Sequence, residues 1–194
     1  MHLNVGSSRF EGFRSRTETN SCNAVRRGSV TRKTICRILP NIIGLISDTH
    51  GLIRPEVLDA LRASDLIIHC GDVGNSAVLD SLRRIAPVRA VRGNDDAGAW
   101  ARGLPSSDMV EIGRNKIYVL HNLSEFDLDP DAAGLTAVVF GHSHKPSIEK
   151  QGGTLFINPG SAGPRRFKLP TTVATLTIRS NHCVARIIPL PLSK

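Results

Sequence analysis

Polar residues that can bind metal ions stand at the ends of short apolar runs along this chain. No other feature of the sequence limits the possible fold as tightly. Asp, Asn and His supply the oxygen and nitrogen ligands that hard and borderline divalent cations accept. Seven such residues are candidates, namely Asp48, His50, Asp72, Asn94, His121, His142 and His144. A fold that brings the ends of several strands together would place them in one pocket.

The apolar runs in the first half of the chain predict alternating strands and helices. Helices are expected from Pro55, which suits a first helical position, and over residues 76–85, with Pro87 just beyond. Strands alternating with helices predict a parallel sheet with right-handed crossovers. The expected buried strands are residues 42–46, 66–68 and 88–91.

After Trp100 the pattern changes to apolar segments paired around turn residues, which predicts hairpins. A further buried strand is expected over residues 137–140. Parallel units followed by hairpins imply an α/β fold in which two mixed sheets pack together with helices outside. The expected hairpins are 109–120 around Gly113-Arg114-Asn115, 148–157 around Gly152-Gly153, and 171–188 around Ser180-Asn181.

Length and cysteine content set simple bounds on the class of protein. A chain of 194 residues forms one domain with a sizeable core. No apolar stretch approaches the roughly 18–20 residues that a membrane span requires, so no span is expected. The cysteines show neither CxxC pairs nor a disulfide spacing, which favours reduced thiols in a cytoplasmic protein. They are Cys22, Cys36, Cys70 and Cys183.

The positive charge of the chain is concentrated at its N-terminus. Residues 1–40 hold eight Lys or Arg and two Glu, a balance of +6, which leaves about +2 of the total +8 for residues 41–194. We therefore expect a disordered basic leader before a domain that spans 41–194. A targeting peptide, a nucleic-acid-binding arm and an upstream start codon are alternatives for the leader. The domain itself has little net charge, so nucleic-acid binding is expected only through the leader.

Each candidate ligand also has an ordinary structural role as an alternative. A His after a strand is more often a hydrogen-bonded structural residue, and Asp48 could cap a helix. Gly71-Asp72 and Gly93-Asn94 could form plain turns. Turns have no need of imidazole, however, so the Asp-x-His and His-x-His pairs together favour a metal site. In open α/β sheets such sites form outside the carboxyl ends of strands.

The motifs DTHG, GDV, GNDD, LH and GHSH, followed by NPGS at 158–161, resemble the calcineurin-like metallophosphoesterases. Within this superfamily they resemble the small prokaryotic phosphodiesterase branch, which includes the retromer scaffold subunit. The resemblance covers residues 42–190 and implies a four-layer α/β/β/α sandwich with a dinuclear metal centre. Asp48, His50, Asp72 and His144 would hold one ion, and Asp72, Asn94, His121 and His142 the other, with Asp72 bridging.

The same resemblance implies a hydrolase that cleaves phosphoester bonds, most simply a phosphodiesterase, by a hydroxide that two metal ions activate. Manganese fits the mixed ligands, with iron, zinc, nickel and magnesium as alternatives. The partner expected is a phosphoester substrate, and the sequence assigns no oligomeric state. A non-catalytic scaffold on the same fold is the alternative function. Catalytic roles would fall to Asp72, Asn94 and His121, and a substrate contact to Asn94. Arg165 and Arg166, just past the NPGS segment, could contact a phosphate, and Arg165 is the one assigned to substrate binding.

Two positions depart from the family pattern. Asp95 follows the GN pair, where larger members of the superfamily carry a His that assists the leaving oxygen. Asn122 and Leu123 stand where family members often have Gly followed by another His. Without an imidazolium to protonate the leaving group, activated aryl diesters are expected to be hydrolysed much faster than alkyl ones. Asp95 or Asp96 could serve as the acid instead.

Overall fold

The computed structural model describes residues 41–166, 168–179 and 182–191. The expected leader, residues 1–40, and the expected turn at Ser180-Asn181 lie outside these described residues. Within them, no helix is both long and apolar enough to cross a bilayer.

A five-stranded sheet contains the predicted β-α-β-α-β unit, and its strand order is β10-β9-β1-β2-β3. Strands β1, β2 and β3 are parallel, as predicted, whereas β9 runs antiparallel to both β1 and β10. The central position of β1 explains its burial, because it is paired on both sides. The bounds are β1 (Asn41–Ile46), β2 (Leu66–His69), β3 (Val88–Ala90), β9 (Thr172–Arg179) and β10 (His182–Pro189).

The two α-helices begin where the sequence predicts. Helix α1 (Pro55–Leu61) has proline at its first position, where no backbone N–H is needed. Helix α2 (Ser76–Arg83) is capped by Asn75, whose side chain accepts a hydrogen bond of 3.2 Å from the backbone N–H of Val78. This helix ends two residues before the predicted boundary, since the chain must turn and extend before Pro87.

A second five-stranded sheet has the order β4-β5-β6-β8-β7. Both predicted hairpins of this sheet are present, as β4 with β5 and as β7 with β8. Strand β6 lies between β5 and β8 and is parallel to both, an arrangement that the sequence did not predict. The bounds are β4 (Ser107–Ile112), β5 (Asn115–Leu120), β6 (Leu135–Val139), β7 (Ser147–Gln151) and β8 (Thr154–Asn158).

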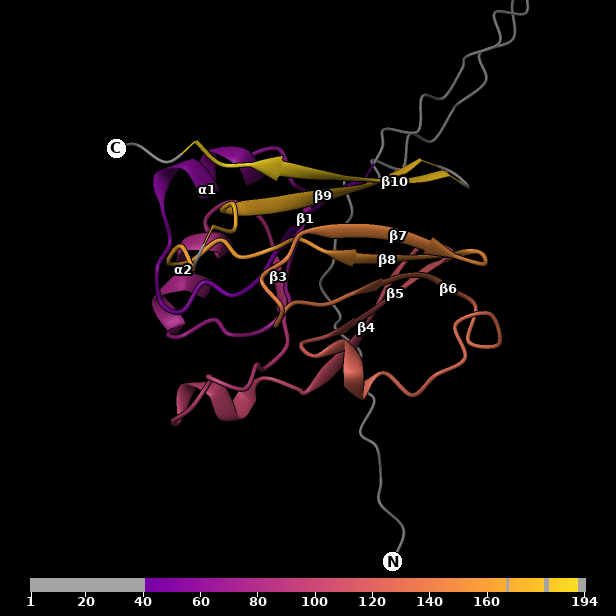
Figure 1. Ribbon diagram of the computed structural model, residues 1–194, viewed down its shortest axis with the longest axis horizontal. Helices are drawn as coiled ribbons and strands as arrows, with labels where there is room; N and C mark the ends of the chain where they lie inside the picture. Colours follow the sequence, from indigo (N-terminus) through magenta and orange to yellow (C-terminus); the bar gives the residue numbers. More distant parts are fainter. Residues whose placement is uncertain (1–40, 167, 180–181, 192–194) are drawn as a thin grey trace, which may run out of the picture. The chain divides into compact units, whose positions relative to one another are not determined.

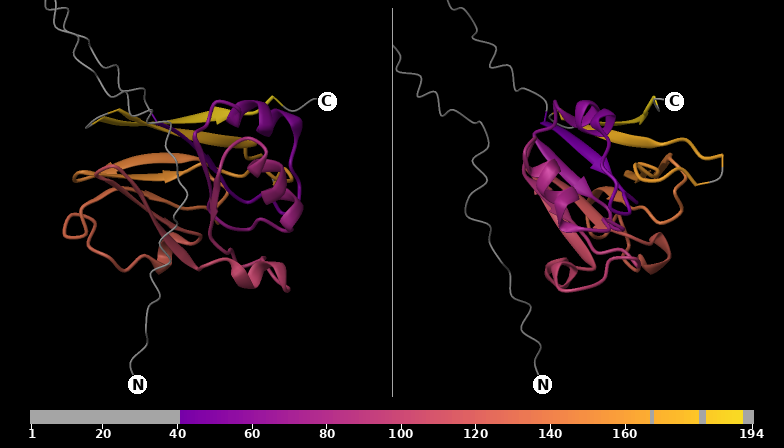
Figure 2. Two further views of the ribbon diagram at one scale, coloured as in Figure 1. Left: turned by 180° about the vertical axis from the view of Figure 1, so that it is seen from behind. Right: turned by 90° about the vertical axis from the view of Figure 1, so that its left-hand side faces the viewer.

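The two sheets pack face to face, with helices α1 and α2 against the outer face of the first sheet (Figures 1 and 2). Buried side chains between the sheets include Leu45, Ile117 and Val139. The outer face of the second sheet is covered by the chain around Phe126, which follows the 3₁₀ helix η2 (Leu123–Glu125). The fourth layer of the sandwich is therefore thin. A second 3₁₀ helix, η1 (Trp100–Gly103), joins the two halves of the chain.

Each sheet presents the carboxyl ends of three parallel strands at one edge. These are β1, β2 and β3 in the first sheet and β5, β6 and β8 in the second. Hydrogen bonds join the two edges: the backbone N–H of Ala162, after β8, donates to the Ser47 carbonyl at 3.0 Å. The Ser161 hydroxyl likewise donates to the Asp48 carbonyl at 3.0 Å. Six loops from two sheets therefore meet in one region.

Candidate metal centre

All seven predicted ligands lie on these loops, in the positions that the sequence pattern suggests. They come together as two groups of side chains, and Asp72 lies between the groups, within 4.0 Å of His50 and 3.4 Å of His121. Asp48 and His50 follow β1, Asp72 follows β2, Asn94 follows β3, His121 follows β5, and His142 and His144 follow β6.

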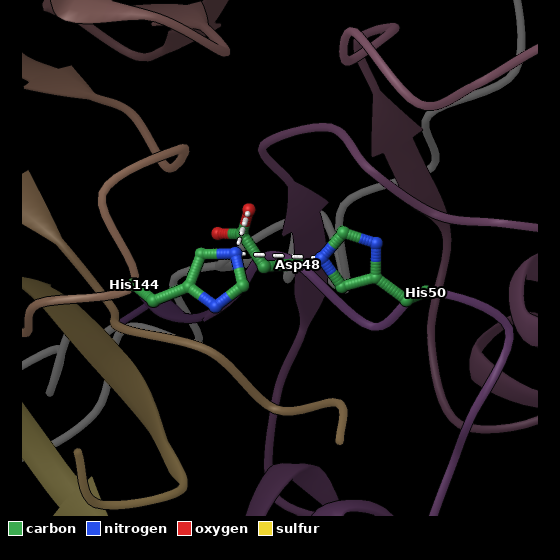
Figure 3. Close-up of side chains that lie close together, drawn as sticks. All are labelled: Asp48, His50 and His144. Atoms are coloured by element: carbon green, nitrogen blue, oxygen red, sulfur yellow. Dashed lines mark hydrogen bonds and ion pairs between the residues drawn. The ribbon is translucent and has the colours of Figure 1, made fainter. Parts of the chain in front are cut away.

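The first group contains Asp48, His50 and His144 (Figure 3). The Nε2 atom of His144 lies 3.2 Å from Oδ1 of Asp48 and 3.4 Å from Nε2 of His50. Figure 3 shows the nitrogens of the two rings facing each other with the carboxylate beside them. Three ligand atoms on three side chains therefore converge on one point, as they do around a bound cation.

The Asp48 carboxylate is fully buried, and neither of its oxygens forms a hydrogen bond of full geometry with the described residues. Burial raises the pKa of Asp48 to about 6, because it outweighs the Ser47 side chain and the His142 backbone N–H, which act as weak donors and lower the pKa. An unpaired buried carboxylate is unfavourable, and a cation within its reach removes the penalty. Burial, together with the nearby charges of Arg166 and His50, lowers the pKa of His144 to about 4. Its imidazole is therefore neutral near pH 7, which is the form that binds a metal.

The second group surrounds the side chain of Asn94. Its Oδ1 atom lies 3.0 Å from Nε2 of His121 and 3.0 Å from Nδ1 of His142. The Nδ1–H of His121 can donate to the carbonyl of Cys70 at 2.7 Å, which leaves the lone pair of Nε2 facing the site. The hydrogen bond thus holds His121 in the orientation that a metal ligand would need.

Nε2 of His121 then faces two other acceptors. Oδ2 of Asp72 lies 3.4 Å from it, and Oδ1 of Asn94 lies 3.0 Å from it. A cation between them stabilises this arrangement. Without a metal a proton can serve, and the pKa of His121 is raised accordingly. Burial alone would lower it, but the Asp72 carboxylate and the Cys70 carbonyl outweigh burial.

Asp72 contacts a histidine of each group. Its Oδ2 atom is 3.4 Å from Nε2 of His121 and 4.0 Å from Nε2 of His50. Its Oδ1 atom accepts a hydrogen bond of 2.8 Å from the backbone N–H of Asp95. Burial would raise the pKa of Asp72, but the bonds from His121 and Asp95 outweigh it, and the pKa is held below its ordinary value. An ionised carboxylate between two groups of ligands is suited to bridging two ions.

Backbone strain is concentrated in the same residues. Among the described residues, every non-glycine with a positive φ is one of the predicted ligands. This left-handed conformation costs roughly 1–2 kcal/mol per residue and persists where surrounding structure enforces it, as it does at functional sites. The five residues are Asp48 (54°), His50 (45°), Asp72 (53°), His142 (67°) and His144 (58°).

Two glycines are required because the loops approach one another closely. A Cβ atom at Gly93 would lie 2.1 Å from Oδ1 of Asp72, and one at Gly141 would lie 1.9 Å from Oγ of Ser47. Neither position has room for a side chain. The glycines of the GN and GHSH motifs therefore allow the ligand loops to pack against each other.

Asp95 contacts three of the ligands. Its Oδ2 atom lies 3.3 Å from Nδ1 of His50, and its Oδ1 accepts a hydrogen bond of 2.9 Å from the side-chain amide of Asn94. Its backbone N–H donates to Asp72. A carboxylate on the outer nitrogen of a ligating histidine fixes the ring and its tautomer. The structure thus gives Asp95 an orienting position, which the sequence alone did not suggest.

Asp96 and Asn158 hold the loops rather than the ligands themselves. The Asp96 carboxylate accepts hydrogen bonds from the backbone N–H groups of Gly74 at 2.8 Å and Gly93 at 2.9 Å. Asn158 donates from its amide to the carbonyl of Gly141 at 2.8 Å and to the Ser143 hydroxyl at 3.1 Å. Since both Asp96 oxygens are engaged by backbone amides, its geometry suits loop positioning better than proton donation.

His69 has a structural position beneath the centre. It is fully buried at the end of β2, and its Nε2 lies 2.9 Å from the hydroxyl of Thr49. Burial lowers the pKa of His69 to about 4, so its ring is neutral near pH 7. The Thr49 hydroxyl in turn donates to the carbonyl of Val73 at 2.8 Å. These bonds tie the loop after β1 to the loop after β2.

Of the two arginines past the NPGS segment, Arg166 lies at the centre. One terminal guanidinium nitrogen, Nη2, is 3.5 Å from Nε2 of His50. Arg165 is exposed, and among the described residues it makes no hydrogen bond or ion pair with the ligands. The expected contact between Arg165 and a substrate therefore stays a prediction.

Comparisons with known proteins agree with this geometry. Residues 42–181 match the family model of the calcineurin-like phosphoesterase superfamily domain. A probable metallophosphoesterase of Methanocaldococcus jannaschii is 35% identical over 77% of this chain and 81% of its own length. A phosphodiesterase of the same organism is 26% identical over 66% of this chain and 89% of its own. Vacuolar protein sorting 29 of Cryptosporidium parvum has the same fold, with a TM-score of 0.61 at 18% identity over 77% of this chain and 97% of its own.

Proposed function

Because this chain belongs to the calcineurin-like phosphoesterase superfamily, we propose that it is a phosphodiesterase with a dinuclear metal centre. The observation that carries the proposal is the buried Asp48 carboxylate, whose oxygens form no hydrogen bond of full geometry with the described residues and which faces the ring nitrogen of His144. A site built only for stability would pair this carboxylate. The donor set fits divalent cations, since it combines carboxylate, amide and neutral imidazole ligands.

We assign four side chains to each ion, with Asp72 shared. Asp48, His50 and His144 would complete one set, and Asn94, His121 and His142 the other. Mixed nitrogen and oxygen ligands favour manganese, with iron, zinc, nickel or magnesium as alternatives. When bound, such a pair of ions supplies an activated water and neutralises the phosphoryl oxygens in an in-line displacement.

The protein's own residues then orient the histidine ligands and set the net charge of the site. Cys70 holds His121 through its carbonyl, and Asp95 holds His50 through its carboxylate. The carboxylates of Asp48 and Asp72 offset two of the four positive charges that two divalent ions bring. The remaining charge attracts an anionic phosphoester.

The thiol of Cys70 is free and buried, which fits our proposal that the protein works in the reducing cytoplasm.

A phosphodiester substrate is supported by the relative that is named a phosphodiesterase. The alternative is a non-catalytic scaffold, which the fold shared with vacuolar protein sorting 29 supports. A scaffold is free to lose metal ligands, whereas all seven candidate positions are filled in this chain. Metal binding is compatible with both functions, since vacuolar protein sorting 29 of Entamoeba histolytica has been solved with Zn²⁺, so hydrolysis is the measurement that separates them.

The test is hydrolysis by metal-free protein that has been reloaded with single divalent ions. We expect Mn²⁺ to restore cleavage of bis(p-nitrophenyl) phosphate in preference to p-nitrophenyl phosphate. Removing a residue that hydrogen-bonds a metal ligand lowers activity by about 10–100-fold. Replacing a ligand should cost more, so Asp72→Asn should lower activity by at least about a hundredfold and by more than His50→Ala does. Asp80→Asn is the matched control, since Asp80 is exposed on α2 and pairs with Arg83.

Two results would contradict the proposal. One is a purified, folded protein that takes up divalent ions and cleaves neither ester. The other is an Asp72→Asn variant with the metal content and turnover of Asp80→Asn. The first result would favour the scaffold, and the second would remove Asp72 from the centre.

A further inference from the structure

Arg166 places a positive charge at the edge of the metal centre. Its side chain is exposed, and Nη2 donates to Nε2 of His50 at 3.5 Å. No carboxylate of the described residues forms an ion pair with it. A guanidinium carries five N–H donors and no acceptor, so most of its donors are free for an anion.

The backbone that leads to Arg166 is fixed against the ligand loop of β1. The backbone N–H of Gly163 donates to the carbonyl of Asp48 at 3.1 Å. The guanidinium of Arg54 donates to the carbonyls of Ala162 at 3.0 Å and Gly163 at 2.7 Å. A Cβ atom at Gly163 would lie 2.4 Å from the Asp48 carbonyl oxygen, which shows how closely the segments pack. Arg166 is thus anchored three residues before its own position.

The contact between Arg166 and His50 uses the lone pair that a metal ion would need. Nε2 of His50 faces Nε2 of His144 at 3.4 Å, so it belongs to the first group of ligands. A cation and an arginine N–H cannot share this lone pair. Once a cation is bound, the guanidinium loses its acceptor and lies beside a positive ion. An anion that bridges the guanidinium and the metal ion would interact favourably with both.

We propose that Arg166 binds a phosphoryl oxygen of the substrate when the centre holds metal, an inference that rests on the proposed function. The planar fork of a guanidinium matches two phosphoryl oxygens, and such charge-assisted hydrogen bonds are about twice as strong as neutral ones. Arg166 would therefore hold the phosphoester from the side of His50. Arg84 carries the same charge and is exposed at the end of α2, where its Nη2 donates to the hydroxyl of Ser81, which makes it the matched control.

The experiment measures the binding of inorganic phosphate to Mn²⁺-loaded protein by calorimetry. Parent, Arg166→Gln, Arg166→Lys and Arg84→Gln are compared, with the metal content of each determined in parallel. We expect Arg166→Gln to weaken phosphate binding by about tenfold, with the metal content unchanged. Arg166→Lys should recover part of the loss, and Arg84→Gln should stay within about twofold of the parent. With bis(p-nitrophenyl) phosphate, KM should rise in Arg166→Gln and not in Arg84→Gln.

The inference is overturned if the Arg166→Gln and Arg84→Gln variants bind phosphate alike in a metal-loaded, active protein. It is also overturned if Arg166→Gln loses metal, because the side chain would then support the centre rather than the substrate. A parent that takes up no divalent ion would instead overturn the proposed function, and this inference with it.

Discussion

Replacing Asp48 with Asn should stabilise the metal-free protein, although it removes a predicted metal ligand. Asp48 is fully buried, and its pKa is raised from 3.8 to about 6. The folded state therefore holds the proton more tightly than the unfolded state does. The ionised form is penalised by about 2 pKa units, or on the order of 3 kcal/mol, well above pH 6. A neutral amide of the same shape escapes this penalty.

The gain should depend on pH with a definite sign. Below about pH 4 the carboxyl is protonated in both states, so Asp48→Asn should change the free energy of unfolding little. Between pH 4 and 6 the parent loses stability relative to the variant, and the difference is complete above pH 6. We expect urea denaturation of metal-free protein to show a gain of about 2–3 kcal/mol at pH 8.

Asp80→Asn is again the control, since Asp80 is exposed and should give no comparable change. Excess Mn²⁺ should reverse the order, because binding to the folded state stabilises the parent and not Asp48→Asn. The reasoning would be refuted by an Asp48→Asn variant that is less stable than the parent at pH 8, or by a difference that does not change with pH.

Three further predictions concern residues around the ligands. Asp95→Asn should weaken Mn²⁺ binding by about 10–100-fold in calorimetry, because Asp95 orients His50; unchanged affinity would contradict this role. Gly93→Ala should cost about 1–3 kcal/mol or more in urea denaturation, whereas Gly103→Ala, with open space around its Cβ, should not; equal stability would argue against the close loop packing. Rates for aryl phosphodiesters should fall steeply as the pKa of the leaving group rises; a flat dependence that steepens in Asp95→Asn would identify Asp95 as the acid.

Much of the fold follows from short-range sequence signals. The apolar run that becomes β1, the proline at the start of α1 and the paired runs of β4 with β5 each carry their own pattern. The place of β6 between β5 and β8 has no such sequence pattern, because strand order depends on which strand edges are left free after the hairpins form. Likewise, the thin fourth layer around η2 could not be predicted, because its sequence has no sustained run of apolar residues at helical spacing.

The convergence of the candidate ligands could be predicted because the Asp-x-His and His-x-His pairs are residue types that turns do not need, whereas the supporting residues could not be predicted. Asp96 resembles a solvated loop residue until the fold brings the amides of Gly74 and Gly93 to its two oxygens. The sequence likewise offers no means of choosing between Arg165 and Arg166. Which of two adjacent side chains faces the site depends on backbone direction, which contacts with Arg54 and Asp48, both distant in the sequence, fix.

The most direct test of the account is the anomalous scattering of crystals of the Mn²⁺-loaded protein, collected at the manganese edge. The account predicts two peaks about 3.5–4 Å apart, one beside Asp48, His50 and His144, and the other beside Asn94, His121 and His142. Both peaks should contact the carboxylate of Asp72. A protein that hydrolyses phosphodiesters but shows no peak, or shows its only peak away from Asp72, would contradict the account.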